Sequence, residues 1–131
     1  MVIWNHPFEQ SNPNDLSYQA AKKMIECARE SIKPIWSSLG ISNYSYGIGI
    51  NSGLAVAGNL GSKKFMDFTV IGDTVNVAQR LETQTGPWEI LIHENVYKNF
   101  KGEVDRSLVM VDGIKLKGKA SETKAYLYNK K

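Results

Sequence analysis

Residues 72–82 read Gly72-Asp-Thr-Val-Asn76-Val-Ala-Gln-Arg80-Leu-Glu82, and their apolar positions recur with the period of an α-helix. The apolar arc of such a helix contains Val75, Val77, Ala78 and Leu81. Its polar arc contains Asn76, Gln79 and Arg80. Because Asn76 and Arg80 are four positions apart, they lie one above the other on the polar face. The stretch therefore predicts an amphipathic helix that presents an amide beside a guanidinium.

The flanking residues set the expected ends of this helix. Asp73 or Thr74 is expected to cap its start, because short side chains that accept hydrogen bonds are favoured there. Gly86-Pro87 should end it at about Thr85. Asp73 could also be a metal ligand, but its position suits a helix cap better, and we interpret it as one.

An amide and a guanidinium on one rigid helix can hold a ribose oxygen and a phosphate in a fixed relation. The same spacing also fits a solvated helix face that happens to carry Asn76 and Arg80. On spacing alone, the solvated face is the simpler interpretation.

Upstream of this helix, the period of the sequence changes to two. Bulky residues alternate with small ones from Tyr44 to Ile50, which predicts a strand with one nearly bare face. The glycines of Gly47-Ile-Gly49 resemble a dinucleotide fingerprint, but they lie inside the strand, whereas that fingerprint follows a strand and opens a helix. Glycines inside a strand indicate instead that another backbone or a ligand comes close. Asn51-Ser-Gly53 is expected to turn the strand into a hairpin with residues 54–60.

The outer segments complete an α+β chain. Residues 15–39 have helical spacing, Pro34 should kink or restart that helix, and Gly40 should end it. Met1–Asn5 resembles the second half of a strand. Further strands are expected at 65–71, 88–92, 104–111, 114–116 and 123–128, and a short helix at 93–100. We expect one sheet with helices against it, in a single domain over residues 1–131 that begins part-way through a fold.

Composition excludes several classes of function. The formal net charge is +3 and the 16 Lys and Arg are scattered, so nucleic acid is not an expected partner. Tyr44 and Tyr46 share a face with aliphatic residues, which favours core packing over stacking on RNA bases. No stretch approaches the ~20 apolar residues that cross a bilayer. With Cys27 as the only cysteine there is no internal disulfide, and a reducing, cytoplasmic setting is expected. Cys27 is expected to be buried, and His6 and His93 lack the spacing of metal ligands.

Three segments resemble the class III adenylate and guanylate cyclases. They are Tyr46-Gly-Ile-Gly-Ile-Asn-Ser-Gly53, Val56-Ala-Gly-Asn-Leu-Gly-Ser62 and the run from Met66 through Asp-Phe-Thr-Val-Ile-Gly-Asp to Glu82. The Gly113–Lys119 run and the Tyr126-Leu-Tyr128 segment are also similar to the end of that family, and the Asp-Phe-Thr-Val-Ile-Gly-Asp form looks bacterial. The resemblance implies a ferredoxin-like α/β sandwich of the cyclase type, missing its first strands and helix.

The resemblance also implies roles for individual residues. Asn76 would orient the ribose and Arg80 would stabilise the charge that grows on the α-phosphate. Lys117 would pair with the terminal phosphates, with Lys119 as the adjacent alternative. Thr69 would occupy the position that selects the purine, and Asp67, on the same strand face, is the alternative.

The cofactors and partners are implied in the same way. The family uses two Mg²⁺ or Mn²⁺ ions, and the aspartates that hold them would lie before Met1, so this chain is expected to provide no metal ligand. Each site of the family forms between two chains, which implies a homodimer that converts ATP to cyclic AMP and pyrophosphate. The isolated chain is then expected to be inactive. A guanylate cyclase, or a non-catalytic module that dimerises or senses a nucleotide, remains the alternative.

Overall fold

The structure is a computed structural model that describes residues 1–62, 65–103, 105–114 and 123–129. Its helices are α1 (Pro13–Cys27), the π-helical turn η1 (Ala28–Ile32), α2 (Lys33–Ser38), α3 (Asp73–Glu82) and α4 (Glu94–Lys98). Its strands are β1 (Ile48–Ile50), β2 (Val56–Ser62), β3 (Phe65–Ile71), β4 (Glu89–His93), β5 (Val109–Ile114) and β6 (Thr123–Asn129). No helix in the described ranges is long and apolar enough to cross a membrane.

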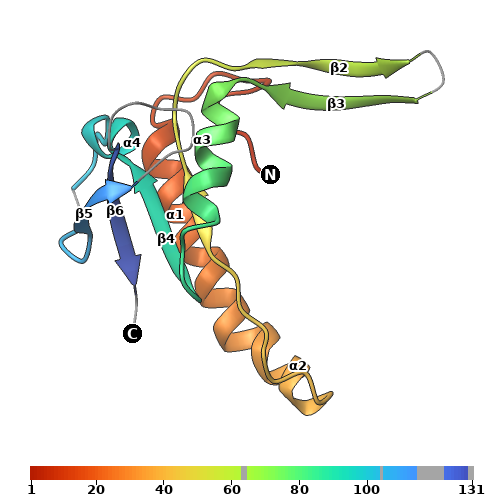
Figure 1. Ribbon diagram of the computed structural model, residues 1–131, viewed down its shortest axis with the longest axis vertical. Helices are drawn as coiled ribbons and strands as arrows, with labels where there is room; N and C mark the ends of the chain where they lie inside the picture. Colours follow the sequence, from red (N-terminus) through yellow and green to blue (C-terminus); the bar gives the residue numbers. More distant parts are fainter. Residues whose placement is uncertain (63–64, 104, 115–122, 130–131) are drawn as a thin grey trace.

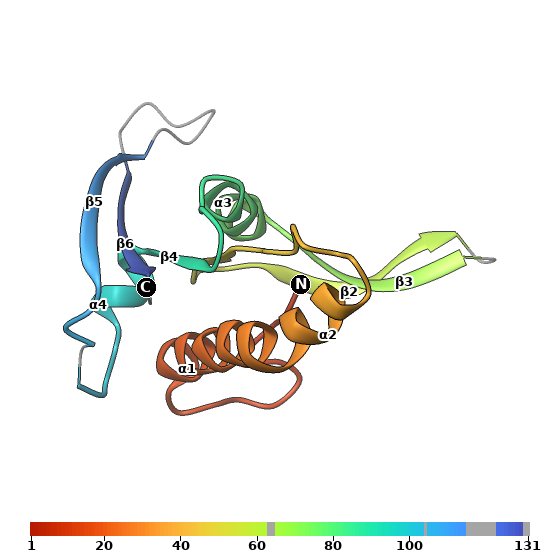
Figure 2. The same cartoon turned by 90° about the horizontal axis from the view of Figure 1, so that it is seen from below.

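A four-stranded sheet in the order β1-β4-β6-β5 forms the body of the protein. β1 runs parallel to β4, and the other pairs are antiparallel. The helices α1 and α3 cover opposite faces of β1 and β4 (Figure 2). Ile90 and Ile92 belong to the core on the α1 side and Leu91 to the core on the α3 side, so β4 is buried on both faces.

The strands β2 and β3 form a separate antiparallel hairpin that projects from this body (Figure 1). The expected hairpin between residues 44–50 and 54–60 is therefore wrong, because β1 pairs with β4 and β2 pairs with β3. The glycine face of β1 is occupied by α3, and residues 51–55 carry the chain across the start of that helix. Residues 51–53 thus belong to a segment that crosses over the start of α3 rather than to the turn of a hairpin. The strands form two sheets, not the single sheet that was expected.

In the N-terminal forty residues, the structure confirms the expected helix but not the expected strand or the burial of Cys27. The helix expected over residues 15–39 is confirmed as α1, η1 and α2, and it restarts where Pro34 occupies the first turn of α2. Gly40 follows with φ +82°, in the left-handed region that favours glycine. Met1–Asn5 contains no strand. Cys27 is exposed, not buried, because it lies off the buried stripe that Ala21, Ile25 and Ala28 form on this helix.

The two histidines lie in different surroundings. His93 is buried at the end of β4, and its Nδ1 accepts a hydrogen bond of 3.1 Å from the amide of Asn95, which caps α4. The ring of the exposed His6 lies 5.3 Å from that of Phe68 on the hairpin. Neither belongs to a metal-binding group of the described residues.

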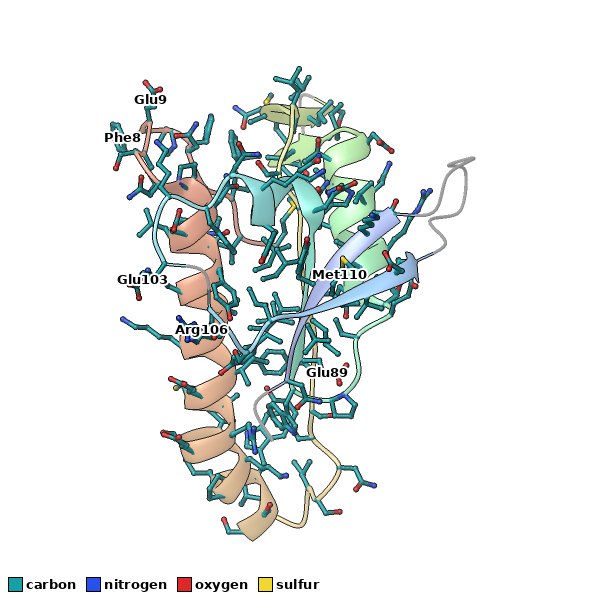
Figure 3. The ribbon with its side chains drawn as sticks, turned by 90° about the vertical axis from the view of Figure 1, so that its left-hand side faces the viewer. Phe8, Glu9, Glu89, Glu103, Arg106 and Met110 are labelled. Carbon is teal, nitrogen blue, oxygen red and sulfur yellow. The ribbon has the colours of Figure 1, made fainter. Side chains whose placement is uncertain are left out.

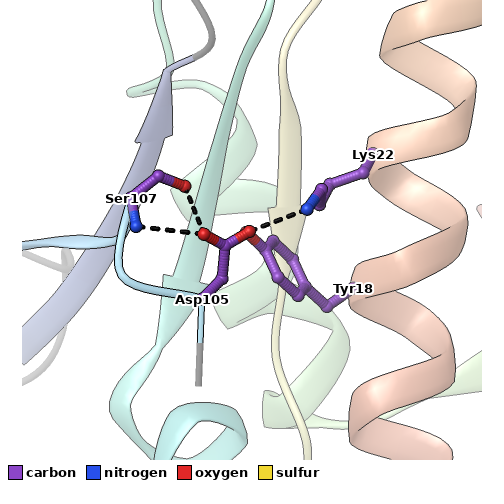
Figure 4. Close-up of polar contacts among 4 residues, drawn as sticks. All are labelled: Tyr18, Lys22, Asp105 and Ser107. Carbon is purple, nitrogen blue, oxygen red and sulfur yellow. Dashed lines mark hydrogen bonds and ion pairs between the residues drawn. The ribbon is translucent and has the colours of Figure 1, made fainter. Parts of the chain in front are cut away.

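Asp105 ties the segment after α4 to helix α1 (Figure 4). Its Oδ2 accepts hydrogen bonds from Tyr18 Oη at 2.9 Å and from Lys22 Nζ at 2.7 Å. Its Oδ1 accepts from the amide of Ser107 at 3.0 Å and from the hydroxyl of Ser107 at 2.6 Å. The Lys22 ammonium, followed by the Ser107 hydroxyl, holds the pKa of Asp105 well below its ordinary value. Burial and the bond to Asp105 raise the pKa of the Tyr18 hydroxyl.

Replacing Asp105 by asparagine should lower the free energy of unfolding by about 2 kcal/mol at pH 7, since hydrogen bonds to charged groups contribute about 1.5–3 kcal/mol each. The pKa of Asp105 is depressed in the folded state, so its contribution is present above the unfolded value of about 3.9 and is lost as the pH falls below that value. Urea unfolding of the wild type and Asp105→Asn should therefore give a smaller difference at pH 3 than at pH 7. A difference that does not change with pH would contradict this account. Glu103→Gln, at an exposed carboxylate, is the matched control, with an effect below about 0.5 kcal/mol.

Candidate functional site

Helix α3 begins directly after β3 and carries the predicted polar pair. Gly72 precedes the helix with φ +148°, a conformation that L side chains rarely adopt. Gly72 is also the N-cap, and no side chain caps the helix, so the expected cap at Asp73 or Thr74 is wrong. Asp73 is instead the first residue of the helix and is exposed, while the Thr74 hydroxyl bonds to the preceding crossover.

The two faces of α3 are those predicted from the sequence. Val77 and Leu81 are at most 1% exposed and pack with Leu91 and Ala125 of the sheet. Asn76 is exposed and Arg80 is half-buried, so neither side chain is packed in the core. The helix thus holds an amide and a guanidinium at the surface, one turn apart, on a backbone anchored by its opposite face.

The glycines of β1 allow α3 to lie directly on the strand. A Cβ built on Gly49 would lie 2.2 Å from the carbonyl oxygen of Ala78 and 2.4 Å from the amide nitrogen of Glu82. A Cβ on Gly47 would lie 1.6 Å from Thr85 Oγ1. The distances at Gly49 confirm that a strand-interior glycine marks the close approach of another backbone, and that backbone belongs to α3. The space beside Gly47 is filled first by the side chain of Thr85, just after the helix. The position of the polar pair therefore depends on the bare face of β1.

A second set of contacts, which the sequence analysis did not single out, holds the start of α3. Asn51 Nδ2 donates to the carbonyl oxygen of Thr74 at 3.0 Å, and Thr74 Oγ1 donates to the carbonyl oxygen of Leu54 at 2.7 Å. A Cβ on Gly53 would lie 2.7 Å from Thr74 Oγ1, so the crossover passes close over the helix. The only available signal was the Asn51-Ser-Gly53 turn pattern, which indicates a turn but not its tertiary partner.

The remaining predicted site residues have different standing. Thr69 is half-buried and Asp67 is exposed, both on β3, opposite Gly58 and Leu60 of β2 respectively. Their alternation along one strand places them on the same face of the hairpin, as expected. Thr69 is separated from α3 only by the last two residues of β3 and Gly72. Lys117 and Lys119 lie outside the described residues.

A cavity of about 650 Å³ lies elsewhere, between α1 and the segment after α4. Glu103 and Arg106 lie beside α1 at this cavity (Figure 3). Tyr18 and Phe100 form its aromatic wall, and the Lys22–Asp105 pair is also part of its lining. Asn76 and Arg80 do not line it, since α3 lies on the other face of the sheet (Figure 2). Across the described ranges, no three or more His, Cys, Asp or Glu side chains are grouped so as to hold a metal ion.

Comparison with known proteins identifies the family of this chain. Residues 10–130 match the family model described as the adenylate and guanylate cyclase catalytic domain. The chain belongs to this family. The resemblance seen in the sequence is thereby confirmed, and with it the α+β fold class, because solved cyclase catalytic domains superpose on this structure.

The similar proteins include both adenylate cyclases and guanylate cyclases. An adenylate cyclase of Anabaena cylindrica is 41% identical over 90 residues, which are 66% of this chain and 18% of that protein. Guanylate cyclase beta of Plasmodium berghei (strain Anka) is 39% identical over 98 residues, which are 74% of this chain and 3% of that protein. The chain therefore spans only a small part of these cyclases.

Two solved cyclase structures are similar over nearly the whole chain. The guanylyl cyclase Cya2 has a TM-score of 0.82 at 26% identity, and the match covers 94% of this chain and 61% of that one. The adenylyl cyclase CyaB from P. aeruginosa has a TM-score of 0.73 at 28% identity, covering 98% of this chain and 65% of that one. This chain therefore spans less than two thirds of either cyclase structure.

Proposed function

We propose that this chain supplies half of a composite adenylate cyclase site, in which α3 contacts ATP bound between two chains. The observation that carries the proposal is the surface position of Asn76 and Arg80, one turn apart on a helix whose other face is buried in the core. Membership of the cyclase family supports it, because the polar pair stands where the resemblance places the family's ribose-orienting and phosphate-stabilising residues.

In the proposed reaction, the ribose 3′-hydroxyl attacks the α-phosphate, its proton is lost, and pyrophosphate leaves. Negative charge redistributes over the phosphoryl oxygens in the transition state, and the planar guanidinium of Arg80 is suited to bind two of them. Asn76 would fix the ribose so that the hydroxyl is in line with the leaving group. Both side chains start from a seated helix, so little reorganisation is needed when the charge develops.

Further residues would hold the two ends of the substrate. Thr69 or Asp67, on the face of β3 that continues toward α3, would contact the purine. A threonine hydroxyl can accept a hydrogen bond from the amino group of adenine or donate one to a ring nitrogen. Lys117, or its neighbour Lys119, would pair with the terminal phosphates. ATP as substrate is consistent with a cytoplasmic site of action.

The complete enzyme would also need two Mg²⁺ or Mn²⁺ ions. The described residues contain no group of three or more His, Cys, Asp or Glu side chains that could hold a metal ion. In this proposal the ions are held by the aspartates that the resemblance places outside this chain, and the roles of Asn76 and Arg80 are limited to binding and charge stabilisation.

The projecting hairpin supports an association between two chains. Five of its aliphatic and aromatic residues are each about half exposed or more, namely Val56, Leu60, Met66, Phe68 and Ile71. By the strand register Val56, Leu60 and Ile71 lie on the face that carries Thr69 and Asp67, and Met66 and Phe68 lie on the opposite face. Apolar side chains exposed in this number on a projecting hairpin are typical of a protein interface. Because β3 leads directly into α3, a partner that covers the hairpin would also approach the polar pair, as a homodimeric site requires.

A mixing experiment tests this proposal. The partner is a cyclase catalytic domain that keeps its metal-binding aspartates but has alanine in place of the Asn and Arg corresponding to Asn76 and Arg80. The mixture should form cyclic AMP from ATP with Mg²⁺ or Mn²⁺, whereas either chain alone should give no measurable product. Parallel assays with GTP decide between adenylate and guanylate cyclase activity.

Co-elution of the two chains in size-exclusion chromatography is the control for association. A folded, associated pair that makes no cyclic nucleotide would contradict the assigned roles. If such a pair still bound ATP, the non-catalytic, nucleotide-sensing alternative would be favoured.

A further inference from the structure

We infer that Asn51 and Thr74 are positioning residues for the polar pair on α3, acting through a strap made by residues 51–55. The inference rests on the proposed function, and it adds to that function two residues to which neither the family resemblance nor the comparisons assign a role. Neither side chain is placed against the nucleotide. Their effect on the reaction would pass entirely through the position of α3.

The strap and the first turn of α3 are joined in both directions. Asn51, just after β1, donates a hydrogen bond to the carbonyl oxygen of Thr74 at 3.0 Å. Thr74 donates in return to the carbonyl oxygen of Leu54, at the other end of the strap, at 2.7 Å. The two bonds therefore fix both the chain that leaves β1 and the chain that approaches β2 against the same residue of the helix.

The strap supplies a constraint that β1 does not. Gly49 sets the distance of α3 from the strand, because backbone atoms of the helix occupy the space that a Cβ would need. The bare face of β1 has no side chain that interlocks with α3, so resistance to sliding or rotation comes from the packing of Val77 and Leu81 against the sheet and from the strap. Bonds to Thr74, only two residues before Asn76, oppose that motion at the end of α3 where the polar pair begins.

The surroundings of Asn51 also favour a role beyond stability. Its Oδ1 is buried and has no hydrogen-bond partner among the described residues. A buried acceptor without a partner costs free energy, and an apolar residue of similar size would avoid that cost. What the amide provides here is the bond from Nδ2 to Thr74, which an apolar residue cannot make.

A shift of about 1 Å in a group that contacts the reacting centre can lower a rate by about 100-fold. Loss of the strap bond should therefore reduce kcat far more than KM. For Thr74→Val, which keeps the shape but removes the hydroxyl donor, we expect kcat in the mixed enzyme to fall by about 10- to 100-fold. Thr74→Ser keeps the donor and should restore kcat to within about threefold of the wild type.

A double-mutant cycle separates positioning from general structural damage. If Thr74 acts through the polar pair, Thr74→Val should lower kcat by a clearly smaller factor in the Asn76→Ala background than in the wild type, because only Arg80 is then left to be positioned. A general loss of structure would lower kcat by the same factor in both backgrounds. All rates are taken per associated complex, measured by size-exclusion chromatography, at a temperature well below unfolding.

Hydrogen exchange of the α3 amides gives a readout without catalysis. Thr74→Val should speed exchange in residues 74–82 and leave β4 and α1 unchanged, whereas Thr74→Ser should match the wild type. The exchange measurement still tests whether the strap holds α3 if the wild-type mixture makes no cyclic nucleotide. That outcome would count against the proposed function alone.

Three results would overturn the inference: an unchanged kcat for Thr74→Val in an active mixture, an equal loss in the Asn76→Ala background, or unchanged exchange of α3. If Thr74→Val does not fold, Asn51→Ala replaces it under the same criteria, because it removes the other bond of the strap and the unpaired Oδ1 together.

Discussion

Arg80→Ala should lower the kcat of the mixed enzyme by about 10²- to 10³-fold, which corresponds to roughly 3–4 kcal/mol of transition-state stabilisation. The guanidinium lies half-buried at the surface of α3 and has no core to support, so its loss should leave the fold intact. The effect should appear in kcat, because the charge on the phosphoryl oxygens redistributes as the bond forms. Arg80→Lys should recover little, since a point charge cannot reproduce a planar fork of donors. Initial rates over a range of ATP concentrations measure both effects.

Gln79→Ala is the matched control for Arg80→Ala. Gln79 is the adjacent residue on the same helix, it is exposed, and the resemblance assigns it no role. We expect its replacement by alanine to change kcat and the midpoint of thermal unfolding very little. An Arg80→Ala enzyme with wild-type kcat, beside an unchanged Gln79→Ala enzyme, would remove Arg80 from the proposed site.

Gly49→Ala should destabilise the protein strongly, although it adds only one methyl group. The added Cβ would lie 2.2 Å from the carbonyl oxygen of Ala78, and backbone atoms cannot turn aside as a side chain can. Helix α3 must lift from β1, which opens the contact between Val77, Leu81 and the sheet. Overpacking of a core typically costs about 1–3 kcal/mol, and we expect the upper end, a fall of on the order of 10 °C in the unfolding midpoint.

Gly58→Ala provides the comparison for this measurement. A Cβ built on Gly58 meets nothing within 4 Å, so alanine there should leave the unfolding midpoint nearly unchanged. Thermal unfolding followed by circular dichroism measures both variants. Equal midpoints for Gly49→Ala and Gly58→Ala would mean that α3 is not seated on β1 as the structure has it.

Local patterns were sufficient to predict α3 and its two faces. The apolar positions recur every three or four residues from Val75 to Leu81, and the structure buries Val77 and Leu81. The meaning of Gly47 and Gly49 was also predictable in kind, because a strand face without side chains leaves room for another backbone. The sequence did not identify that backbone, since the contact joins segments about thirty residues apart.

Strand pairing could not be predicted in the same way. Residues 44–50 and 54–60 both alternate and are joined by turn residues, so a local hairpin satisfied every rule that depends on neighbours. The actual partner of β1 is β4, a parallel strand some forty residues later. Parallel strands are joined by long crossover connections rather than by a short turn, so no local sequence pattern indicates that they pair. The hydrogen bonds of Asn51 and Thr74 in the strap could not be predicted either. Their acceptors are a helix carbonyl and a loop carbonyl that are distant in sequence and are brought close only by the fold.

The candidate site was only partly accessible from residue patterns. The spacing of Asn76 and Arg80 predicted that they share a helix face, but not that a nucleotide would meet it. That step came from the family resemblance, which the match over residues 10–130 confirms at the level of the family. The individual roles of Thr69, Asn76, Arg80 and the Lys117–Lys119 run stay predictions.

A crystal structure of the mixed complex with 3′-deoxy-ATP, which lacks the attacking hydroxyl, tests the arrangement most directly. The guanidinium of Arg80 should lie about 3 Å from an α-phosphate oxygen, and the amide of Asn76 should be equally close to the ribose, with the metal-binding aspartates on the partner chain. A nucleotide bound away from α3, for example in the cavity beside α1, or a polar pair that faces only solvent in the complex, would contradict it.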